Sequence, residues 1–486
     1  MTQILIVGAG PVGLTMAAEL ARYGIELRII DRAPHATETS KALALWSRTL
    51  ELMDRAGVTP AFLEAGLRAH AATIRCEGKV LGSARLDDIP SPYNYALMLP
   101  QCYTERLLAA HLGSLGVNVE REVELVGFTE RGNAVEARLR HTDGREETMR
   151  SPWLIGCDGA HSTVRHGTGI EFAGEAQGDD WMLADVCLSG EGAPASDEVS
   201  IFLHRDGPLA VFPIPGGRAR VIASIGKTDP EHPRPDPTLA DVQAMVDSRR
   251  GPDIAVSDPA WLATFRINER KVKNYKEGRV FLAGDAAHVD SPAGGQGMNT
   301  GMQDAFNLSW KLATVERGEA APSLLDSYSL ERSAVGELVL RNATRLTDIG
   351  TLSSPAAQAA RNLAMRFLLG LHAVQQRFAN TLSEVEIAYA KSPLTQGRGA
   401  GDRLPPERYE GMPPGTGNSP RFVLFSADAG KGAALTARYP NLIEAKPRMP
   451  FDRYRLLIVR PDGYIGLSAG HEDWAAAQAY LDRLAV

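Results

Sequence analysis

The stretch Ile4-Leu-Ile-Val-Gly-Ala-Gly-Pro-Val-Gly13 decides the fold of this chain. Residues 4–7 form a short apolar run, which is typical of a buried strand. The pattern predicts a helix from about Val12 to Tyr23 and a second buried strand over residues 27–30. A strand, a glycine turn, a helix and a second strand form one βαβ unit, which implies a parallel sheet with a right-handed crossover.

The three glycines of this stretch have separate physical roles. In a G-x-G-x-x-G turn, Gly8 permits the tight turn, Gly10 lets backbone approach a pyrophosphate, and Gly13 lets the helix pack close to the strand. Asp31 follows the second strand, where a carboxylate can accept hydrogen bonds from a ribose. The turn therefore predicts a dinucleotide site, whose expected residues here are Gly8, Gly10, Pro11, Val12, Gly13, Asp31 and Arg32.

Two later motifs also follow strand-like runs. Cys157-Asp158-Gly159 comes after Trp153-Leu-Ile155 and leads to Arg165, which a purely structural interpretation pairs with Asp158. Residues 279–288 end in Gly284-Asp285 and continue into a glycine-rich loop over residues 291–299 that opens a helix.

The glycine-rich loop suits a flavin. Its backbone N–H groups can stabilise the negative charge that develops at the N1–O2 edge of a reduced flavin. Asp285 can bond sugar or ribityl hydroxyls. His288 is a weak candidate for a base, because the sequence shows no orienting carboxylate near it except Asp290.

The overall composition excludes several classes of protein. The chain has 486 residues and a net charge of −7, which provides no basic field for nucleic acid or anionic membrane. Its four cysteines form no C-x-x-C pair, and neither a disulfide framework nor a metal-binding motif is evident. No apolar run reaches the ~18 residues of a membrane span, so we expect a cytoplasmic, unanchored protein.

The rest of the chain divides into β-rich and helical parts. Residues 180–230 read as an antiparallel sheet and residues 298–346 as helical. Apolar residues between Leu363 and Val385 are spaced by steps of three and four, which predicts one long helical face packed on its own chain or on a second copy.

Together these motifs resemble the FAD-dependent aromatic hydroxylases, the single-component flavoprotein monooxygenases of the para-hydroxybenzoate hydroxylase type. The resemblance covers residue 2 to about residue 340, and it includes shorter runs at residues 40–42, 47–51, 99–108 and 328–332. The tail, with Gly401-Asp-Arg-Leu-Pro405 and Arg460-Pro-Asp-Gly-Tyr464, is similar to the thioredoxin-like C-terminal domain of phenol and polyketide hydroxylases, although it contains no cysteine.

The resemblance implies an α/β fold: a Rossmann-like FAD-binding domain, an inserted mixed or antiparallel β-sheet substrate domain and a small thioredoxin-like C-terminal domain. We expect the first part of the FAD-binding domain at residues 1–175, the substrate sheet at 176–270, the return of the FAD-binding domain with long helices at 271–392, and the C-terminal domain at 393–486.

The resemblance also implies further residues along a non-covalently bound FAD. Lys41 and Gln101 would lie along the cofactor, although many relatives have arginine in place of Lys41. Arg48 would lie on the flavin side, and Asp158 belongs to a motif that relatives link to both FAD and NAD(P)H. The third motif would contribute Gly284, Asp285, Pro292, Gly295, Gly297, Met298 and Asn299.

The activity that the resemblance implies is hydroxylation of a phenolic or polycyclic polyketide substrate. NADPH or NADH would reduce FAD, and O₂ would then form a C4a-hydroperoxyflavin that transfers oxygen. The cofactor supplies this chemistry, so no catalytic side chain is identified. Baeyer–Villiger oxidation, epoxidation, cyclisation and non-catalytic FAD or ligand binding remain open, as does a homodimer. Trp46, Phe212, Pro292 and Met302 are candidates for the substrate pocket, although they also suit a plain core.

Overall fold

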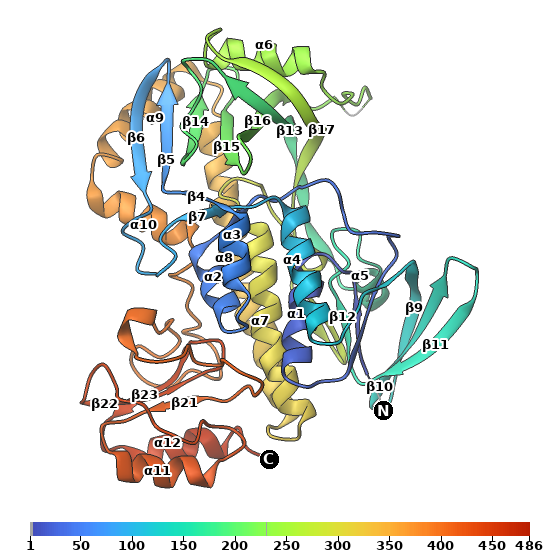
Figure 1. Cartoon of the computed structure of the whole chain (residues 1–486), viewed down its shortest axis with the longest axis vertical. Helices are drawn as coiled ribbons and strands as arrows, with labels where there is room; N and C mark the ends of the chain where they lie inside the picture. The colour runs from blue at the N-terminus through green and yellow to red at the C-terminus, as the bar shows by residue number, and fades with distance from the viewer. Residues whose placement is uncertain (1–2, 230) are drawn as a thin grey trace.

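The computed structural model describes residues 3–229 and 231–486. Met1 and Thr2, at the start of the expected first domain, lie outside the described residues, as does Pro230 in the expected substrate domain. The described chain has three layers along its long axis, with a large sheet at the top of Figure 1, a central sheet with helices, and the C-terminal region below.

The central six-stranded sheet contains the first motif, in the order β18-β19-β12-β1-β2-β8. Strand β1 is parallel to its neighbours β12 and β2, and helix α1 (Pro11–Arg22) connects β1 to β2, which confirms the βαβ unit. The strands are β1 (Ile4–Val7), β2 (Leu27–Asp31), β8 (Glu120–Arg121), β12 (Leu154–Gly156), β18 (Lys276–Glu277) and β19 (Val280–Leu282).

The register of this sheet brings the three motifs together. Val7 lies opposite Gly156, and Gly156 lies opposite Leu282, so β1, β12 and β19 end at the same level. Each motif follows the carboxyl end of one of these strands. Ligands of open α/β sheets bind at this edge.

The large sheet has eight strands in the order β20-β17-β13-β16-β15-β14-β5-β6. The antiparallel run that the sequence predicts is confirmed, but β5 and β6 also join, because β14 pairs with β5 in parallel. The strands are β5 (Ala71–Cys76), β6 (Lys79–Arg85), β13 (Phe172–Ser189), β14 (Glu198–Leu203), β15 (Leu209–Ile214), β16 (Arg218–Lys227), β17 (Ala255–Val272) and β20 (His288–Val289).

Two smaller sheets and several short helices complete the upper layers. One sheet contains β9 (Val123–Arg131), β10 (Ala134–His141) and β11 (Glu146–Ser151), and the other contains β3 (Ala44–Leu45), β4 (Leu67–Ala69) and β7 (Ala96–Met98). The helices are α2 (Ser47–Asp54), α3 (Thr59–Ala65), α4 (Gln101–Ser114), α5 (Thr163–Thr168) and α6 (Leu239–Arg249).

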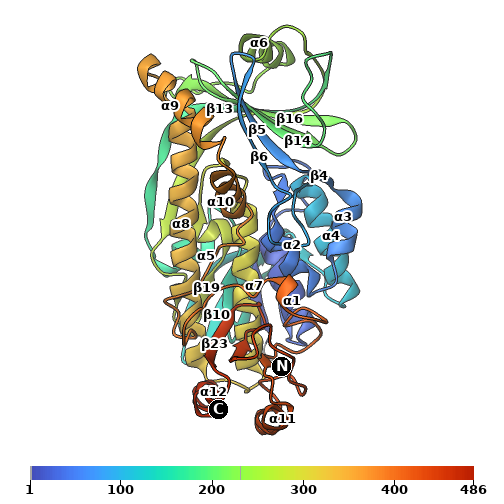
Figure 2. The same cartoon turned by 90° about the vertical axis from the view of Figure 1, so that its left-hand side faces the viewer.

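The predicted helical region from residue 298 to 346 forms two helices. Helix α7 (Gly297–Glu316) packs against α1, and α8 (Asp326–Gly350) runs alongside the body to the large sheet (Figure 2). The turn η2 (Pro322–Leu325) separates them. None of the described helices is both long enough and apolar enough to cross a lipid bilayer.

The prediction of one continuous helix between Leu363 and Val385 is wrong. The chain breaks into α9 (Pro355–Leu368) and α10 (His372–Leu382) around Gly370, and glycine weakens a helix interior. The exposed fraction of Leu363 is 72% and that of Phe367 is 70%, whereas Leu382 and Val385 are buried. Only the C-terminal end of this apolar series therefore belongs to the core.

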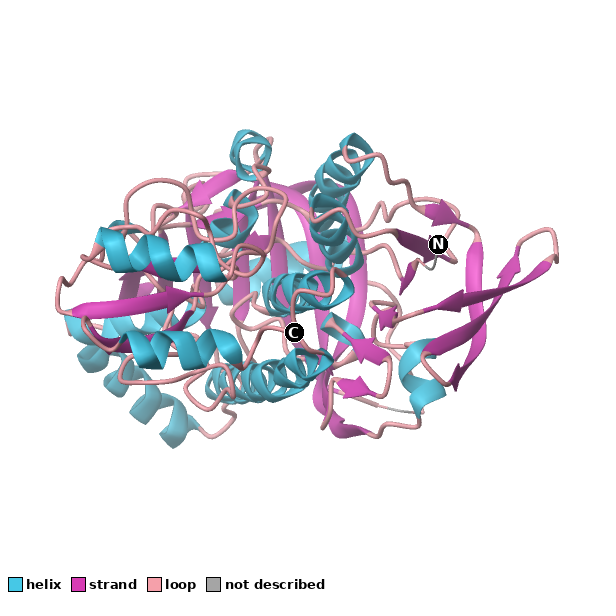
Figure 3. Ribbon diagram, turned by 90° about the horizontal axis from the view of Figure 1, so that it is seen from below, coloured by secondary structure: helices cyan, strands magenta, loops and turns pink. Residues whose placement is uncertain are grey.

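The C-terminal region contains a three-stranded antiparallel sheet, β21 (Val423–Phe425), β22 (Arg455–Val459) and β23 (Ile465–Gly470). Helices α11 (Ala429–Arg438) and α12 (Trp474–Asp482) cover the face of this sheet that is turned away from the body (Figure 3). The apolar core of this region is continuous with Tyr23, at the end of α1, and with Trp310 of α7, both in the central layer. The C-terminal region therefore shares its core with the central layer.

Candidate FAD site

The glycine turn after β1 is built for close backbone packing and an open outer side. A Cβ on Gly13 would lie 1.9 Å from the carbonyl oxygen of Gly8, and a Cβ on Gly8, whose φ is +99°, would lie 2.4 Å from that of Cys157. A Cβ on Gly10 would meet nothing within 4 Å. The close packing of the protein itself thus requires glycine at residues 8 and 13. Gly10 instead faces free space at the N-terminus of α1, where a phosphate can bind.

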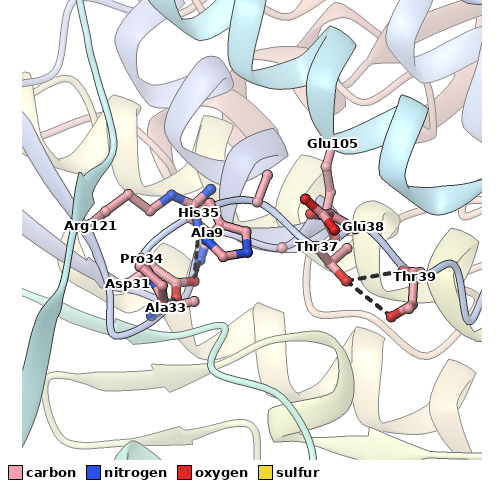
Figure 4. A pocket seen from close by; sticks show the side chains of 12 residues that line it. Ala9, Asp31, Ala33, Pro34, His35, Thr37, Glu38, Thr39, Glu105 and Arg121 are labelled. Atoms are coloured by element: carbon pink, nitrogen blue, oxygen red, sulfur yellow. Dashed lines mark hydrogen bonds and ion pairs between the residues drawn. The ribbon is translucent and has the colours of Figure 1, made fainter.

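Asp31 lies in a cavity of about 370 Å³ beside this turn (Figure 4). Its carboxylate accepts hydrogen bonds from the N–H groups of Ala9 at 2.7 Å and Ala33 at 2.8 Å. Both bonds fix the carboxylate at the cavity wall and leave further lone pairs for a ribose. The cavity also touches Gly10, Glu105 and Arg121.

A second cavity of about 220 Å³ joins the first motif to the second. Gly8, Gly10, Arg32, Asp158 and His161 are among its lining residues. The tertiary structure thus brings together predicted site residues that are more than a hundred positions apart in the sequence.

The predicted ion pair between Arg165 and Asp158 does not form. Arg165 donates to the carbonyl oxygens of Ala286 and Ala160, at 3.0 and 2.7 Å. Asp158 accepts from the Ser162 hydroxyl and from the Val164 N–H group. Burial raises the pKa of Asp158, and these hydrogen bonds act against that shift. The two side chains are satisfied separately.

Gly284 and Asp285 lie in the turn η1 (Gly284–Ala286), directly after β19. A Cβ on Gly284 would lie 2.7 Å from a methyl group of Val12, so the first and third motifs are in contact. Asp285 remains accessible to solvent at the edge of this turn. Surrounding protein raises its pKa, while the charges of His288 and Lys41 lower it. A carboxylate near Lys41 at this level of the sheet can accept hydrogen bonds from polyol hydroxyls.

Asp304 of α7 organises the third motif, and the sequence pattern did not reveal it. Its carboxylate accepts from the Gly284 N–H group at 3.0 Å and from Arg332 at 2.6 Å, and it lies 2.9 Å from Nε2 of His288. Burial lowers the pKa of His288, but the charge of Asp304 outweighs it and the pKa is raised. His288 is therefore oriented by Asp304, twenty residues after Gly284, and its buried pairing argues for a structural role.

Two side chains tie the glycine-rich loop to strand β3 and the residue after it. Asn299 donates to the carbonyl oxygens of Ala44 at 2.8 Å and Gly295 at 3.0 Å, and it accepts from the Trp46 N–H group at 2.8 Å. The Trp46 indole donates to the Gly294 carbonyl at 3.0 Å. With the loop held in this way, Pro292 is exposed. The N–H groups of Gly297 and Met298, at the start of α7, have no carbonyl partner within the helix.

The segment that carries Lys41 is held by polar contacts from two sides. The amide of Gln101 accepts from the Ala42 N–H group at 3.2 Å and donates to Glu105 at 2.9 Å. From the large sheet, Arg220 donates to the Lys41 carbonyl at 3.0 Å, and it pairs with Asp185 through two bonds of 2.7 and 2.8 Å. The sequence pattern did not identify Arg220, because its partners are distant along the chain.

Arg48 lies apart from these groups. Its guanidinium is buried, pairs with Glu51 at 3.1 Å and donates to the Asp462 carbonyl at 2.7 Å in the C-terminal region. It also lies over the ring of Tyr464. The structure therefore gives Arg48 a role in anchoring the C-terminal region in place of the expected flavin contact.

The substrate candidates separate into two groups. Trp46 and Phe212 belong to one apolar cluster between the large sheet and α10, together with Phe378 and Leu382 of α10. Met302 is fully buried in the main core and packs elsewhere. Sequence spacing placed Phe378 and Leu382 on a helical face but did not show what they cover.

The residues present fit FAD. The open side of Gly10 and the N-terminus of α1 suit the pyrophosphate, the cavity around Asp31 suits the adenosine, and Asp285 with the free N–H groups of α7 suits the ribityl chain and the pyrimidine ring.

The comparisons with known proteins agree with this geometry. Residues 1–343 match the family described as FAD binding domain. The chain is 36% identical to 6-methylpretetramide 4-monooxygenase of Streptomyces rimosus, over 99% of this chain and 93% of that protein.

Two solved structures share the whole fold. One is CabE, an aromatic hydroxylase from angucycline biosynthesis, which is 27% identical with a TM-score of 0.82 and covers 100% of both chains. The other is the Diels-Alderase PyrE3 of pyrroindomycin biosynthesis, which is 27% identical with a TM-score of 0.80 over 100% of this chain and 99% of the other. From the matched domain, the relatives and the site, the chain belongs to the FAD-dependent aromatic hydroxylases and is an FAD-dependent monooxygenase.

Proposed function

We propose that this monooxygenase hydroxylates a polycyclic aromatic substrate of the polyketide type, using O₂ and NADPH or NADH. The names of the full-length relatives support this substrate class, because 6-methylpretetramide and the angucyclines are fused-ring compounds. Phenols are smaller, single-ring aromatic compounds and belong in the same test.

One observation carries the proposal on the side of the structure. Trp46 bonds the glycine-rich loop through its indole and packs into the apolar cluster with Phe212 and Phe378. A flat, apolar molecule held in this cluster would lie beside the loop that we assign to the flavin. Offset stacking on Trp46 and Phe212 suits fused rings.

The chain's own residues would bind and orient FAD and the substrate and would exclude water from them. We propose that Gly10, Asp31, Asp158 and Asp285 hold FAD, together with Gly8, Pro11, Val12, Gly13, Arg32, Lys41, Gln101, Gly284, Pro292, Gly295, Gly297, Met298 and Asn299. FAD, when bound, supplies the oxygen-transfer chemistry. The large sheet and α10 would exclude water from the face of the loop at Pro292.

We also propose the domain organisation that the resemblance implies, with boundaries near residues 175, 270 and 392. The thioredoxin-like assignment of residues 393–486 is supported by the order of its elements. Strand β21 and α11 are followed by parallel bridges at residues 443 and 448, and then by the antiparallel pair β22–β23 and α12. We further propose a homodimer that forms through the exposed apolar face of α9. We also propose a cytoplasmic location, because the four cysteines are free.

A second function is favoured by one relative. The similarity to the Diels-Alderase PyrE3 over the full chain shows that this fold also occurs in a cyclising enzyme. Cyclisation is redox-neutral, so it would consume neither NAD(P)H nor O₂. The stoichiometry of turnover separates the two functions.

The test is anaerobic stopped-flow reduction of the purified flavoprotein by NADPH and by NADH, with a panel of phenols and fused-ring polyketides, followed by product analysis after O₂ is admitted. Faster reduction with one fused-ring ligand, and a hydroxylated product formed in step with NAD(P)H consumption, is the expected result. A ring-closed product without NAD(P)H consumption would support cyclisation. Absence of flavin reduction with every ligand would contradict the proposed hydroxylation of these substrates.

A further inference from the structure

Asp290 lies between β20 and the glycine-rich loop and is turned towards the start of α7. One of its carboxyl oxygens, Oδ1, is 2.7 Å from the position that a Cβ of Gly297 would occupy. Only glycine therefore fits at residue 297 while Asp290 keeps this position. The carboxyl group lies directly beside the first turn of α7.

The other oxygen of Asp290 has no hydrogen-bond partner in the part of the chain that the structure describes. Oδ2 is buried and, among the described residues, accepts no hydrogen bond. A buried carboxylate oxygen without a donor is costly, because it has lost water and gained nothing in exchange. Such a group is unusual in a folded protein and is commonly tied to function.

The charges around Asp290 are mostly negative. Asp285 and His288 face it from its own segment, Glu269 from β17, and Glu384 from the segment after α10, while the hydroxyl group of Tyr275 is also near. His288 is the cation of this set, and its Nε2 is already held by Asp304. Burial raises the pKa of Asp290 to about 6; His288 acts against this shift and Asp285 adds to it. The carboxyl group therefore titrates close to neutral pH.

The first turn of α7 is also the segment that we assign to the flavin pyrimidine. Reduction of FAD by two electrons and one proton leaves one negative charge near N1 and O2 of that ring. A negative charge beside Asp290 would disfavour a second one on its carboxylate. The reduced flavin and an ionised Asp290 would compete for the same N–H groups and the same helix dipole.

We propose that Asp290 takes up a proton from solvent when the flavin is reduced. This inference rests on the proposed function, because it needs the flavin at the glycine-rich loop. In the balanced step, NAD(P)H transfers a hydride to FAD, which forms NAD(P)⁺ and anionic reduced FAD, and one solvent proton converts the Asp290 carboxylate to the acid. Near neutral pH the protein then binds two protons per two electrons overall, one on the flavin and one on Asp290.

The experiment is spectroelectrochemical titration of FAD-loaded wild type and of the Asp290→Asn variant from about pH 5 to about pH 9. Asparagine has nearly the same shape as aspartate but does not titrate. The control variant is Asp348→Asn, which removes an exposed acid of α8 that also acts on Glu269. An Asp290→Ser variant is a second test if asparagine prevents folding.

Asp290 should have one pKa beside oxidised FAD and a higher pKa beside reduced FAD. Between these two pKa values, we expect the wild-type midpoint potential to fall with pH at the slope for two protons per two electrons. Asp290→Asn should follow the slope for one proton over the same range, lie at a higher potential there, and converge with wild type at about pH 5. Asp348→Asn should follow wild type. Equal slopes in wild type and both Asp290 variants, with FAD bound in each, would overturn the inference alone, whereas failure of the wild type to bind FAD would overturn the proposed function.

Discussion

Arg460 of the C-terminal region pairs with Glu331 of α8 through two hydrogen bonds, of 2.6 and 2.9 Å, with both side chains buried. Lys311 and Asp462 extend the pair into a network that joins α7, α8 and the residues after β22. The C-terminal region is thus joined to the central layer by charge as well as by a shared apolar core.

Breaking this pair should destabilise the protein. Arg460→Ala leaves part of the Glu331 charge uncompensated in the interior, so we expect the free energy of unfolding to fall by about 3–5 kcal/mol. Arg460→Lys keeps the charge but loses the two-bonded geometry and should fall between wild type and Arg460→Ala. Urea denaturation followed by tryptophan fluorescence measures the change. Arg483→Ala removes an exposed arginine of the same region, and a loss as large as that of Arg460→Ala would contradict the argument.

The glycine turn supplies a matched pair of substitutions. Gly13→Ala forces a Cβ to within 1.9 Å of the Gly8 carbonyl, so it should lower the free energy of unfolding by about 3 kcal/mol even without FAD. Gly10→Ala meets nothing within 4 Å and should leave the melting temperature of the apoprotein unchanged. It should nevertheless weaken FAD binding by at least about tenfold, because the methyl group fills the space assigned to the pyrophosphate. Fluorescence titration with FAD checks this, and normal affinity in Gly10→Ala would place the pyrophosphate elsewhere.

Asp285 should contribute directly to FAD affinity. Asp285→Ala removes the acceptor for the ribityl hydroxyls, and the loss of one such charge-assisted bond weakens binding by about tenfold. Asp285→Asn keeps one acceptor oxygen and should lose less. The flavin content of the purified variants and the dissociation constant for FAD measure the effect. Unchanged flavin content in Asp285→Ala would mean that another carboxylate holds the ribityl chain.

Glu384 predicts a dependence of stability on pH. This buried carboxyl accepts from Thr300 at 2.7 Å and from Gln303 at 2.5 Å, and burial raises its pKa from 4.5 to about 7. The folded state therefore binds more protons than the unfolded state between these values, and stability falls as pH rises through this window. Glu384→Gln should be more stable than wild type by about 3 kcal/mol at about pH 8, and the difference should disappear at about pH 4. Parallel curves of melting temperature against pH for the two proteins would show that Glu384 does not titrate in this range.

Much of the fold could be predicted because its signals are local. The G-x-G-x-x-G turn encodes its own strand, helix and packing in ten residues, and the predicted helix from Val12 to Tyr23 is observed as α1. The antiparallel run of the large sheet is also encoded in neighbouring strands. The participation of β5 was not predicted, because its parallel partner β14 is more than a hundred residues away and no short-range pattern records that pairing.

The sequence by itself determined the glycines, the strand ends and the family, because backbone conformation and close packing depend on residues within one turn. Only the tertiary structure decided that Arg48 faces the C-terminal region and that Asp304 orients His288. It also decided that one buried oxygen of Asp290 has no hydrogen-bond partner among residues 3–229 and 231–486. The physical reason is that the energy of a buried charge depends on every group around it, and these groups come together only when distant strands and helices have packed.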